Sequence, residues 1–412
     1  MRELLRGSAG IAVAMGVMNV ATYGFQMVAA RLLGPEAYGA IAGLMALLMV
    51  VAVLQLGLQA TAARRISATP GHVAQIEDVI LGVTYRAAVG LGLLLLLASP
   101  AVWLLLRLDS IVPALLLALA AVPLTVMGGQ AGILQGERRW FPLALVYLGM
   151  GIPRLVLGSI FVLISPTETS AMLGVALGLF VPALAGWYAL RRGRATGETS
   201  DDHVLRPIVK ETVRNSAALL AFFVLSNADI VLARNVLDGH DAGLYAGGLI
   251  LTKAVLFLPQ FVVVVAFPSM AGAGAGDRRR ALTRSLAAVL VLGLLCTAAA
   301  VALSPVALIF VGGPEYGEVQ SLLWVFSVLG TLLAMLQLLV YSVLARQGTR
   351  ATFLVWGGVL LLLASGTWID SLGVLLVTIT VIDAALFAVL LAVSLRHSGP
   401  LAVAPDTGDV PV

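Results

Sequence analysis

The chain is poor in the residues on which metal sites and many enzymes depend. Its 412 residues include one cysteine, Cys296, four histidines and two lysines, Lys210 and Lys253. One cysteine excludes an intrachain disulfide and every metal site built from several cysteines. The histidines stand in polar connections without metal-ligand spacing, and no glycine precedes either lysine, which excludes an ATPase P-loop. We therefore expect no metal and no cofactor.

Charge is scarce as well. Only 11% of the residues are charged and 60% are hydrophobic, against about 25% and 45–50% in soluble domains. This small number of polar side chains cannot cover a water-exposed surface. We therefore expect the outer surface to face lipid. The net charge of +4 comes from short clusters between apolar runs. It forms no stripe beside aromatic residues, which argues against a nucleic-acid partner.

The chain also lacks a polar segment large enough for an active site outside the membrane. The longest one before the C-terminal tail, 191–206, is short and basic. A membrane glycosyltransferase usually carries acidic catalytic residues in a sizeable loop. No histidine lies near an acidic residue of an apolar run, so Ser-His-Asp chemistry has no support either. We predict that the protein is not an enzyme.

Long apolar runs are what the chain has in abundance. A hydrocarbon core about 30 Å thick needs roughly 20 residues of helix, and these runs are apolar on all sides, unlike the short alternating strands of a barrel. We predict an all-α, polytopic integral membrane protein of about twelve transmembrane helices. The expected spans are 8–30, 38–62, 79–106, 111–135, 141–165, 169–190, 208–235, 241–268, 281–311, 317–345, 350–368 and 371–395.

The basic residues orient these spans. With a cytoplasmic N-terminus, every even-numbered connection is rich in arginine and every odd-numbered one is poor, as the positive-inside rule requires. The outer connections hold only Arg31, Arg107 and Arg234. The sequence therefore predicts that both termini are cytoplasmic. The inner connections hold Arg2, Arg6, Arg64, Arg65, Arg138, Arg139, Arg191, Arg192, Arg194, Arg206, Lys210, Arg214, Arg278, Arg279, Arg280, Arg284, Arg346, Arg350 and Arg396.

The chain divides into two six-helix halves. The polar segment 191–206 follows the sixth span and reads as a cytoplasmic linker, and the joint at 134–139 after span 4 resembles the joint at 346–350 after span 10. Six spans is an even number, so the halves are parallel repeats, expected to enclose a central lumen and to rock for alternating access. The predicted units are 1–190, the linker 191–206, 207–396 and a polar cytoplasmic tail, 397–412.

Two joint sequences resemble one family. The first span ends in ARLLGPEAYG (30–39), the seventh span ends in NADIVLARNV (227–236), and the next begins with DAGLYAGGLILTKAVLFLP (241–259). Both resemble the bacterial polysaccharide (O-antigen type) flippases, members of the superfamily that also holds the multidrug-and-toxin extruders. The resemblance covers nearly the whole chain, but its motifs are loose, so it identifies the superfamily better than the substrate.

The resemblance implies a transporter in the bacterial cytoplasmic (inner) membrane. It would move a polyprenyl-linked oligosaccharide or polysaccharide precursor from the inner to the outer leaflet. Its partners would be this glycan, membrane lipid, H+ or Na+ as a driving ion, and a glycan polymerase or glycosyltransferases. One alternative is an ion-coupled extruder of drugs or small cations from the same superfamily. Another is a non-transporting membrane partner of a glycan synthase.

Three cations lie within the predicted spans. Arg154 and Lys253 are near the centres of spans 5 and 8, and Arg86 lies in span 3. A charge on a lipid face is costly, so such groups face a partner or a water-filled cavity. We expect Arg154 and Lys253 to face one lumen and bind an anionic pyrophosphate headgroup, Arg154 through its planar fork. The alternative is pairing with acids inside the bundle. Arg86 either contacts substrate or snorkels to the cytoplasmic surface.

Two acids, Asp229 in span 7 and Asp383 in span 12, complete the set of intramembrane charges. We expect Asp383 to be an ion-coupling carboxylate. Asp229 is either a second group of the lumen or a partner for Arg234. Amides within the spans could bind sugar hydroxyls, but more often they join helices. Gly-x-x-x-Gly pairs that begin at Gly174 and Gly243 predict close helix contacts.

Overall fold

The computed structural model describes residues 8–191, 199–257, 275–344 and 349–396. Every regular element in these ranges is a helix, which confirms the all-α prediction. The predicted tail, 397–412, and the end of the predicted eighth span, 258–268, lie outside the described residues.

The first two predicted spans form one continuous element, α1 (Ser8–Ala68), which is interrupted at Gly34. Gly34 has φ 72° and ψ 174°, a conformation that a side chain disfavours. Pro35 follows it, and a proline restricts the residue before it to extended backbone while offering no N–H for a helix. The pair therefore reverses the chain between the two predicted spans, as the sequence requires.

The remaining helices overlap the other predicted spans, except that the ninth, 281–311, is divided between α9 and α10. They are α2 (Val73–Leu106), α3 (Val112–Gly136), α4 (Trp140–Ile164), α5 (Glu168–Leu190), α6 (Leu205–Val236), α7 (Gly239–Phe257), α9 (Ala275–Ala302), α10 (Ser304–Val311), α11 (Leu323–Leu344), α12 (Thr349–Ser365) and α13 (Leu372–Arg396). Short 3-10 turns lie before α2, before α6 and before α11, the last being η4 (Pro314–Leu322).

Nine helices of the described residues are long and apolar enough to cross a membrane. Counting the two segments of α1 separately, and adding α7 and α12, gives the predicted number of spans. Large apolar side chains lie outward on these helices; on α2, Val89, Leu93 and Leu97 are 57%, 55% and 81% exposed. Such faces are stable only against lipid, so the chain is a multi-pass membrane protein.

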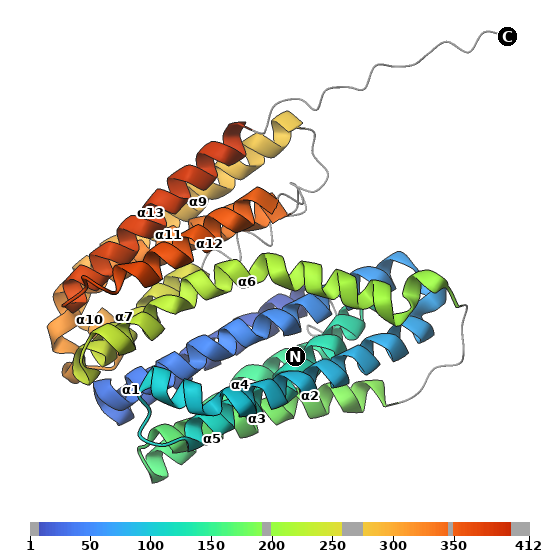
Figure 1. The fold of residues 1–412 in the computed structure, drawn as a ribbon, viewed down its shortest axis with the longest axis horizontal. Coiled ribbons are helices and arrows are strands. Elements are labelled where there is room, and N and C mark those ends of the chain that lie inside the picture. Colours follow the sequence, from blue (N-terminus) through green and yellow to red (C-terminus); the bar gives the residue numbers. More distant parts are fainter. Residues whose placement is uncertain (1–7, 192–198, 258–274, 345–348, 397–412) are drawn as a thin grey trace, which may run out of the picture.

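The helices form two groups that meet along α1 and α6 (Figure 1). On one side α2, α3, α4 and α5 pack together; on the other α11 packs against α9 and α13, and α12 against α13. Both α6 and α7 pack on α1. We call the end of the molecule that holds Gly34 the kink end and the end that holds residues 199–211 the linker end. In Figure 1 the two groups converge near α7 and α10, at the kink end, and diverge toward the other.

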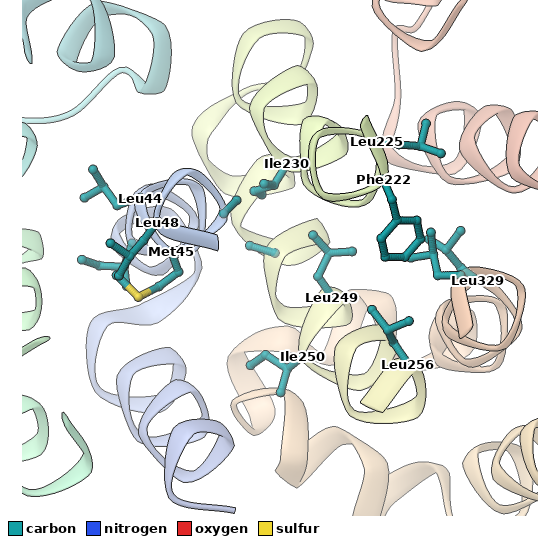
Figure 2. Close-up of a cluster of buried hydrophobic side chains, with 14 of the residues drawn as sticks. Leu44, Met45, Leu48, Phe222, Leu225, Ile230, Leu249, Ile250, Leu256 and Leu329 are labelled. Carbon is teal, nitrogen blue, oxygen red and sulfur yellow. The ribbon is translucent and has the colours of Figure 1, made fainter. Parts of the chain in front are cut away.

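An apolar core joins the two groups at their meeting line. Figure 2 shows Leu44, Met45 and Leu48 on α1, and Ile230 of α6 and Leu249 of α7 beyond the opposite side of that helix. On the far side of α6 and α7, Phe222 lies beside Leu329 of α11 in the same view. The core is therefore continuous from the first group, through α6 and α7, into the second.

Close backbone contacts occur where the glycine pairs predict them. A side chain at Gly174 would lie 2.4 Å from the Cα atom of Gly158, so α5 sits directly on α4. A side chain at Gly243 would lie 2.0 Å from the carbonyl oxygen of Pro35, so α7 sits directly on the kink of α1. The second contact joins the two groups at the kink end.

Candidate functional site

Three of the five intramembrane charges meet inside the second group of helices. Asp229 of α6, Lys253 of α7 and Asp383 of α13 are 2%, 9% and 3% exposed. Each of the three interacts electrostatically with the other two. We call these residues the charged triad. Residues from positions 229 to 383 are thus brought to one buried site, which contains two acids and one base.

Hydrogen bonds hold two members of the triad, Lys253 and Asp229, in place. The Lys253 ammonium donates to the carbonyl oxygen of Ser226 and, over 3.2 Å, to Oδ1 of Asn227, both on α6. The hydroxyl of Tyr245 on α7 donates to Oδ2 of Asp229 over 2.9 Å. Oδ1 of Asp229 accepts the N–H of Ile230 over 2.9 Å. Charged groups held in this way inside a low-dielectric region keep fixed positions.

Arg154 lies elsewhere, in the first group. It is 8% exposed, and its Nε atom is buried without a hydrogen-bond partner in the part of the chain that the structure describes. Gly151 and Gly158, one turn to either side, pack on Met18 and Phe25 of α1, and α5 also lies against the Arg154 backbone. The guanidinium group therefore belongs to the meeting point of α1, α4 and α5.

The first segment of α1 separates Arg154 from Lys253. The Tyr23 hydroxyl of α1 donates to the Lys253 carbonyl over 3.0 Å, so α7 contacts α1 on the Tyr23 side. At 100° per residue, Tyr23 points roughly 140–160° away from Met18 and Phe25, which face α4. The structure thus brings Lys253 together with Asp229 and Asp383, and it does not bring Lys253 together with Arg154.

Arg86 lies on an exposed face of α2. Its neighbours in sequence on that face are apolar, with Tyr85 42% and Val89 57% exposed. This position favours the snorkelling interpretation, in which the aliphatic part of the side chain lies along lipid and the guanidinium reaches the interface.

Several side chains that contact these charged residues could not be predicted from the sequence. Tyr245 and Asn227 appear in the joint sequences only as parts of a motif, and their contacts with the triad depend on how α6 and α7 pack. The interpretation that pairs Asp229 with Arg234 is not what the structure shows. Arg234 donates instead to backbone carbonyl oxygens of α1 and α2. No sequence signal marks such acceptors, because every residue carries one.

Amides of the first group serve to join helices. Nε2 of Gln59 on α1 donates to Oε1 of Gln135 on α3 over 2.9 Å and to the Tyr147 hydroxyl of α4 over 2.8 Å. Gln55 donates to Oε1 of Gln59 over 3.2 Å. Three helices are linked by one side chain, which is the common role of amides within membranes.

Comparison with known proteins places the chain among membrane transporters by fold. Residues 4–273 match the family described as "Polysaccharide biosynthesis protein". A search of curated proteins found no match. A solved structure described as the inward-facing conformation of a multidrug resistance MATE family transporter of the MOP superfamily is 14% identical, with a TM-score of 0.73, over 93% of this chain and 94% of that one.

Two further solved structures have similar coverage. A MOP superfamily transporter from Pyrococcus furiosus, described as having a binding pocket of reverse polarity, is 17% identical over 96% of this chain and 97% of that one, with a TM-score of 0.65. An outward-facing MATE family transporter is 16% identical over the same shares, with a TM-score of 0.61.

Proposed function

Because the chain belongs to the polysaccharide biosynthesis protein family, we propose that it is a transporter that turns a lipid-linked saccharide from the inner to the outer leaflet by alternating access. The substrate would be a glycan on a polyprenyl pyrophosphate. In this scheme the linker end is cytoplasmic, both termini are cytoplasmic, and the protein lies in the bacterial inner membrane. A glycan polymerase or glycosyltransferases would use the same substrate on either side.

The main support for an anionic substrate is that the Nε atom of Arg154 is buried and has no hydrogen-bond partner among the described residues. A buried guanidinium with an unpartnered nitrogen leaves part of its desolvation cost uncompensated, and such groups are retained where a ligand supplies the missing partner. A pyrophosphate offers oxygens at the spacing of the guanidinium fork. Arg154 is therefore our candidate for the residue that holds the headgroup as it crosses the low-dielectric region.

The charged triad supplies a candidate for energy coupling. Two carboxylates and one ammonium leave one negative charge when all three are ionised, and one proton or one Na+ would neutralise it. The contacts of Lys253 with α6 favour its role as the internal partner of Asp229 and Asp383 over direct contact with substrate. Loading and release of the ion would then change the attraction between α6, α7 and α13.

A second function, ion-coupled extrusion of drugs or small cations, is supported by the fold similarity to MATE transporters. A cation binder is expected to offer an acidic, unpaired site to its substrate. Arg154, buried in the first group, argues for an anion instead. The third candidate, a non-transporting partner of a glycan synthase, would tolerate substitution of all these buried charges.

The gene should be deleted in the native bacterium, and lipid-linked glycans and surface polymer should be measured together. We expect surface polymer to be lost and its lipid-linked precursor to accumulate on the inner leaflet, with both restored by the wild-type chain. Precursor and polymer that both stay at wild-type levels would refute the flippase. Efflux of cationic dyes by the same strains would then test the second function.

A further inference from the structure

We infer that two arginines, Arg234 of α6 and Arg107 at the end of α2, form a reciprocal latch that closes the molecule at the kink end, and that the latch must release before this end can open. The inference deepens the proposed function and rests on its alternating-access cycle. It gives a role to two charges that the sequence places in outer connections.

Arg234 caps the C-terminus of α2. Its Nε and Nη2 atoms both donate to the carbonyl oxygen of Leu106, over 2.9 and 2.7 Å, and Nη2 also donates to the carbonyl of Arg107 over 2.8 Å. Leu106 is the last residue of α2. The last four carbonyls of a helix have no partner within it, and the negative end of its dipole attracts a cation. Arg234, which is only 4% exposed, supplies both the hydrogen bonds and the positive charge from inside the protein.

Arg107 does the same for α6 in the opposite direction. Nη2 of Arg107 donates to the carbonyl of Asn235 over 2.8 Å, and Nη1 donates to that of Leu237 over 3.3 Å. The helix α6 ends at Val236, so both acceptors lie at its C-terminus. Arg107 adopts a left-handed conformation with φ 48°. The Asn235 amide adds a bond to the Leu105 carbonyl over 2.9 Å.

The charges around Arg234 hold it to the first group of helices. Glu168, Glu36 and Asp109 all attract it electrostatically, whereas Arg107 repels it. The three acids come from the first turn of α5, the kink of α1 and the turn after α2. Arg234 also donates to the Glu36 carbonyl over 3.3 Å. Three separate elements of one group thus converge on one side chain of α6.

Other contacts between the two groups surround the latch at the kink end, and we call them the seal. The Gly243–Pro35 backbone contact presses α7 onto α1. The Tyr316 hydroxyl of η4, a fully buried side chain, donates to the Ala30 carbonyl over 3.2 Å. The buried apolar side chains between the two groups can separate without leaving charge behind. The arginines instead leave two helix ends uncapped when the groups part.

The latch differs from the contact at the linker end. There Glu211 of α6 accepts from Arg64 over 2.7 Å and from Arg65 over 2.8 Å, both at the end of α1. That contact also joins α6 to the first group, but it lies at the opposite end of the helix. Substituting Glu211 therefore provides a matched control, which removes a charged contact of α6 without touching the kink end.

The test measures the distance between the two groups of helices at the kink end in the full-length protein. In a Cys296→Ser background, spin labels at Val112→Cys and Leu303→Cys report the separation of the groups, because these exposed positions (42% and 55%) lie at the kink end, Val112 at the start of α3 and Leu303 between α9 and α10. The labelled protein is placed in nanodiscs, without substrate, and the distance distribution is recorded by pulsed electron resonance. Size exclusion confirms that each variant is folded and monodisperse.

We expect Arg234→Ala to raise the fraction of widely separated labels by at least about tenfold, the scale of one lost charge-assisted hydrogen bond. Arg107→Ala, a change at an exposed side chain that is easier for the fold to tolerate, should act in the same direction. Glu211→Gln should leave the kink-end distances unchanged. Distances that stay unchanged in Arg107→Ala would overturn the latch, as would an equal shift in Glu211→Gln.

The result is independent of the substrate. Labels that separate in the Arg107 and Arg234 variants support the latch even if the deletion strain keeps its surface polymer, which would refute only the flippase. Labels that do not separate refute the latch even if the same strain accumulates lipid-linked precursor.

Discussion

Replacing Lys253 with methionine tests whether the charged triad acts as one unit. Methionine keeps an unbranched chain of similar length, so packing changes little, whereas the ammonium is lost. The variant leaves Asp229 and Asp383, which are 2% and 3% exposed, facing each other without a cation. Removal of one partner from a buried charged group costs about 3–5 kcal/mol. We therefore expect a marked fall in thermal stability.

The companion variant removes the excess charge again. In Lys253→Met with Asp383→Asn, one carboxylate remains, hydrogen-bonded by Tyr245, and most of the lost stability should return. Double-mutant coupling between neighbours of this kind amounts to about 0.5–3 kcal/mol. The single variant should also recover part of its stability at lower pH, because a protonated carboxyl carries no charge.

The assay is the unfolding temperature of the detergent-solubilised protein, followed by tryptophan fluorescence at pH 5.5 and pH 8. Gln59→Leu, which removes an uncharged helix-joining side chain of the first group, serves as the control and should not depend on pH. If the double variant loses as much stability as the two single variants lose together, Lys253 and Asp383 act independently. The triad would then be refuted as a unit.

Three further outcomes follow from individual side chains. Arg154→Gln should abolish transport while leaving stability unchanged or higher, because it removes an uncompensated buried charge; Arg86→Gln, at an exposed arginine, should transport like wild type, and equal losses in both would remove Arg154 from the substrate path. Gly34→Ala should lower the free energy of unfolding by about 1 kcal/mol, because its φ of 72° disfavours a side chain, whereas Gly317→Ala, with no atom within 4 Å of the added carbon, should not; thermal unfolding of both variants measures the difference. Gly243→Val should cost about 1–3 kcal/mol or more, because its side chain would meet a backbone carbonyl of α1, and wild-type stability in this variant would contradict the direct contact of α7 with the kink.

The sequence predicts the spans well because each signal is local. An apolar run of about 20 residues specifies a membrane helix regardless of its neighbours, and the first two predicted spans, 8–30 and 38–62, leave between them a joint that contains Gly34 and Pro35. The structure agrees on both. Among the described residues, the prediction was wrong at the end of the ninth span. There α9 stops at Ala302, and a separate helix, α10, begins with a proline in its first turn.

The candidate site is only half predictable. Composition singles out Asp229, Lys253 and Asp383, because charges are rare inside spans, but their meeting depends on packing among α6, α7 and α13. Arg154 carries the same sequence signal as Lys253 and lies on the other side of α1. Arg234 shows the limit most clearly. Its partners are carbonyl oxygens, which have no sequence signature, whereas the nearby Asp229 suggests an ion pair that the fold does not make.

The course of α6 bears on how the chain is made. It begins just after the linker, yet it packs on α1 and is tied to the first group by Glu211 at one end and Arg234 at the other. During synthesis the first seven spans can therefore assemble as a unit before the last five have left the ribosome. The surface of α6 that later meets α12 would stay exposed in that interval. A ribosome pause or a chaperone that shields this surface would act after α6, which ends at Val236, instead of at the end of the linker at residue 206.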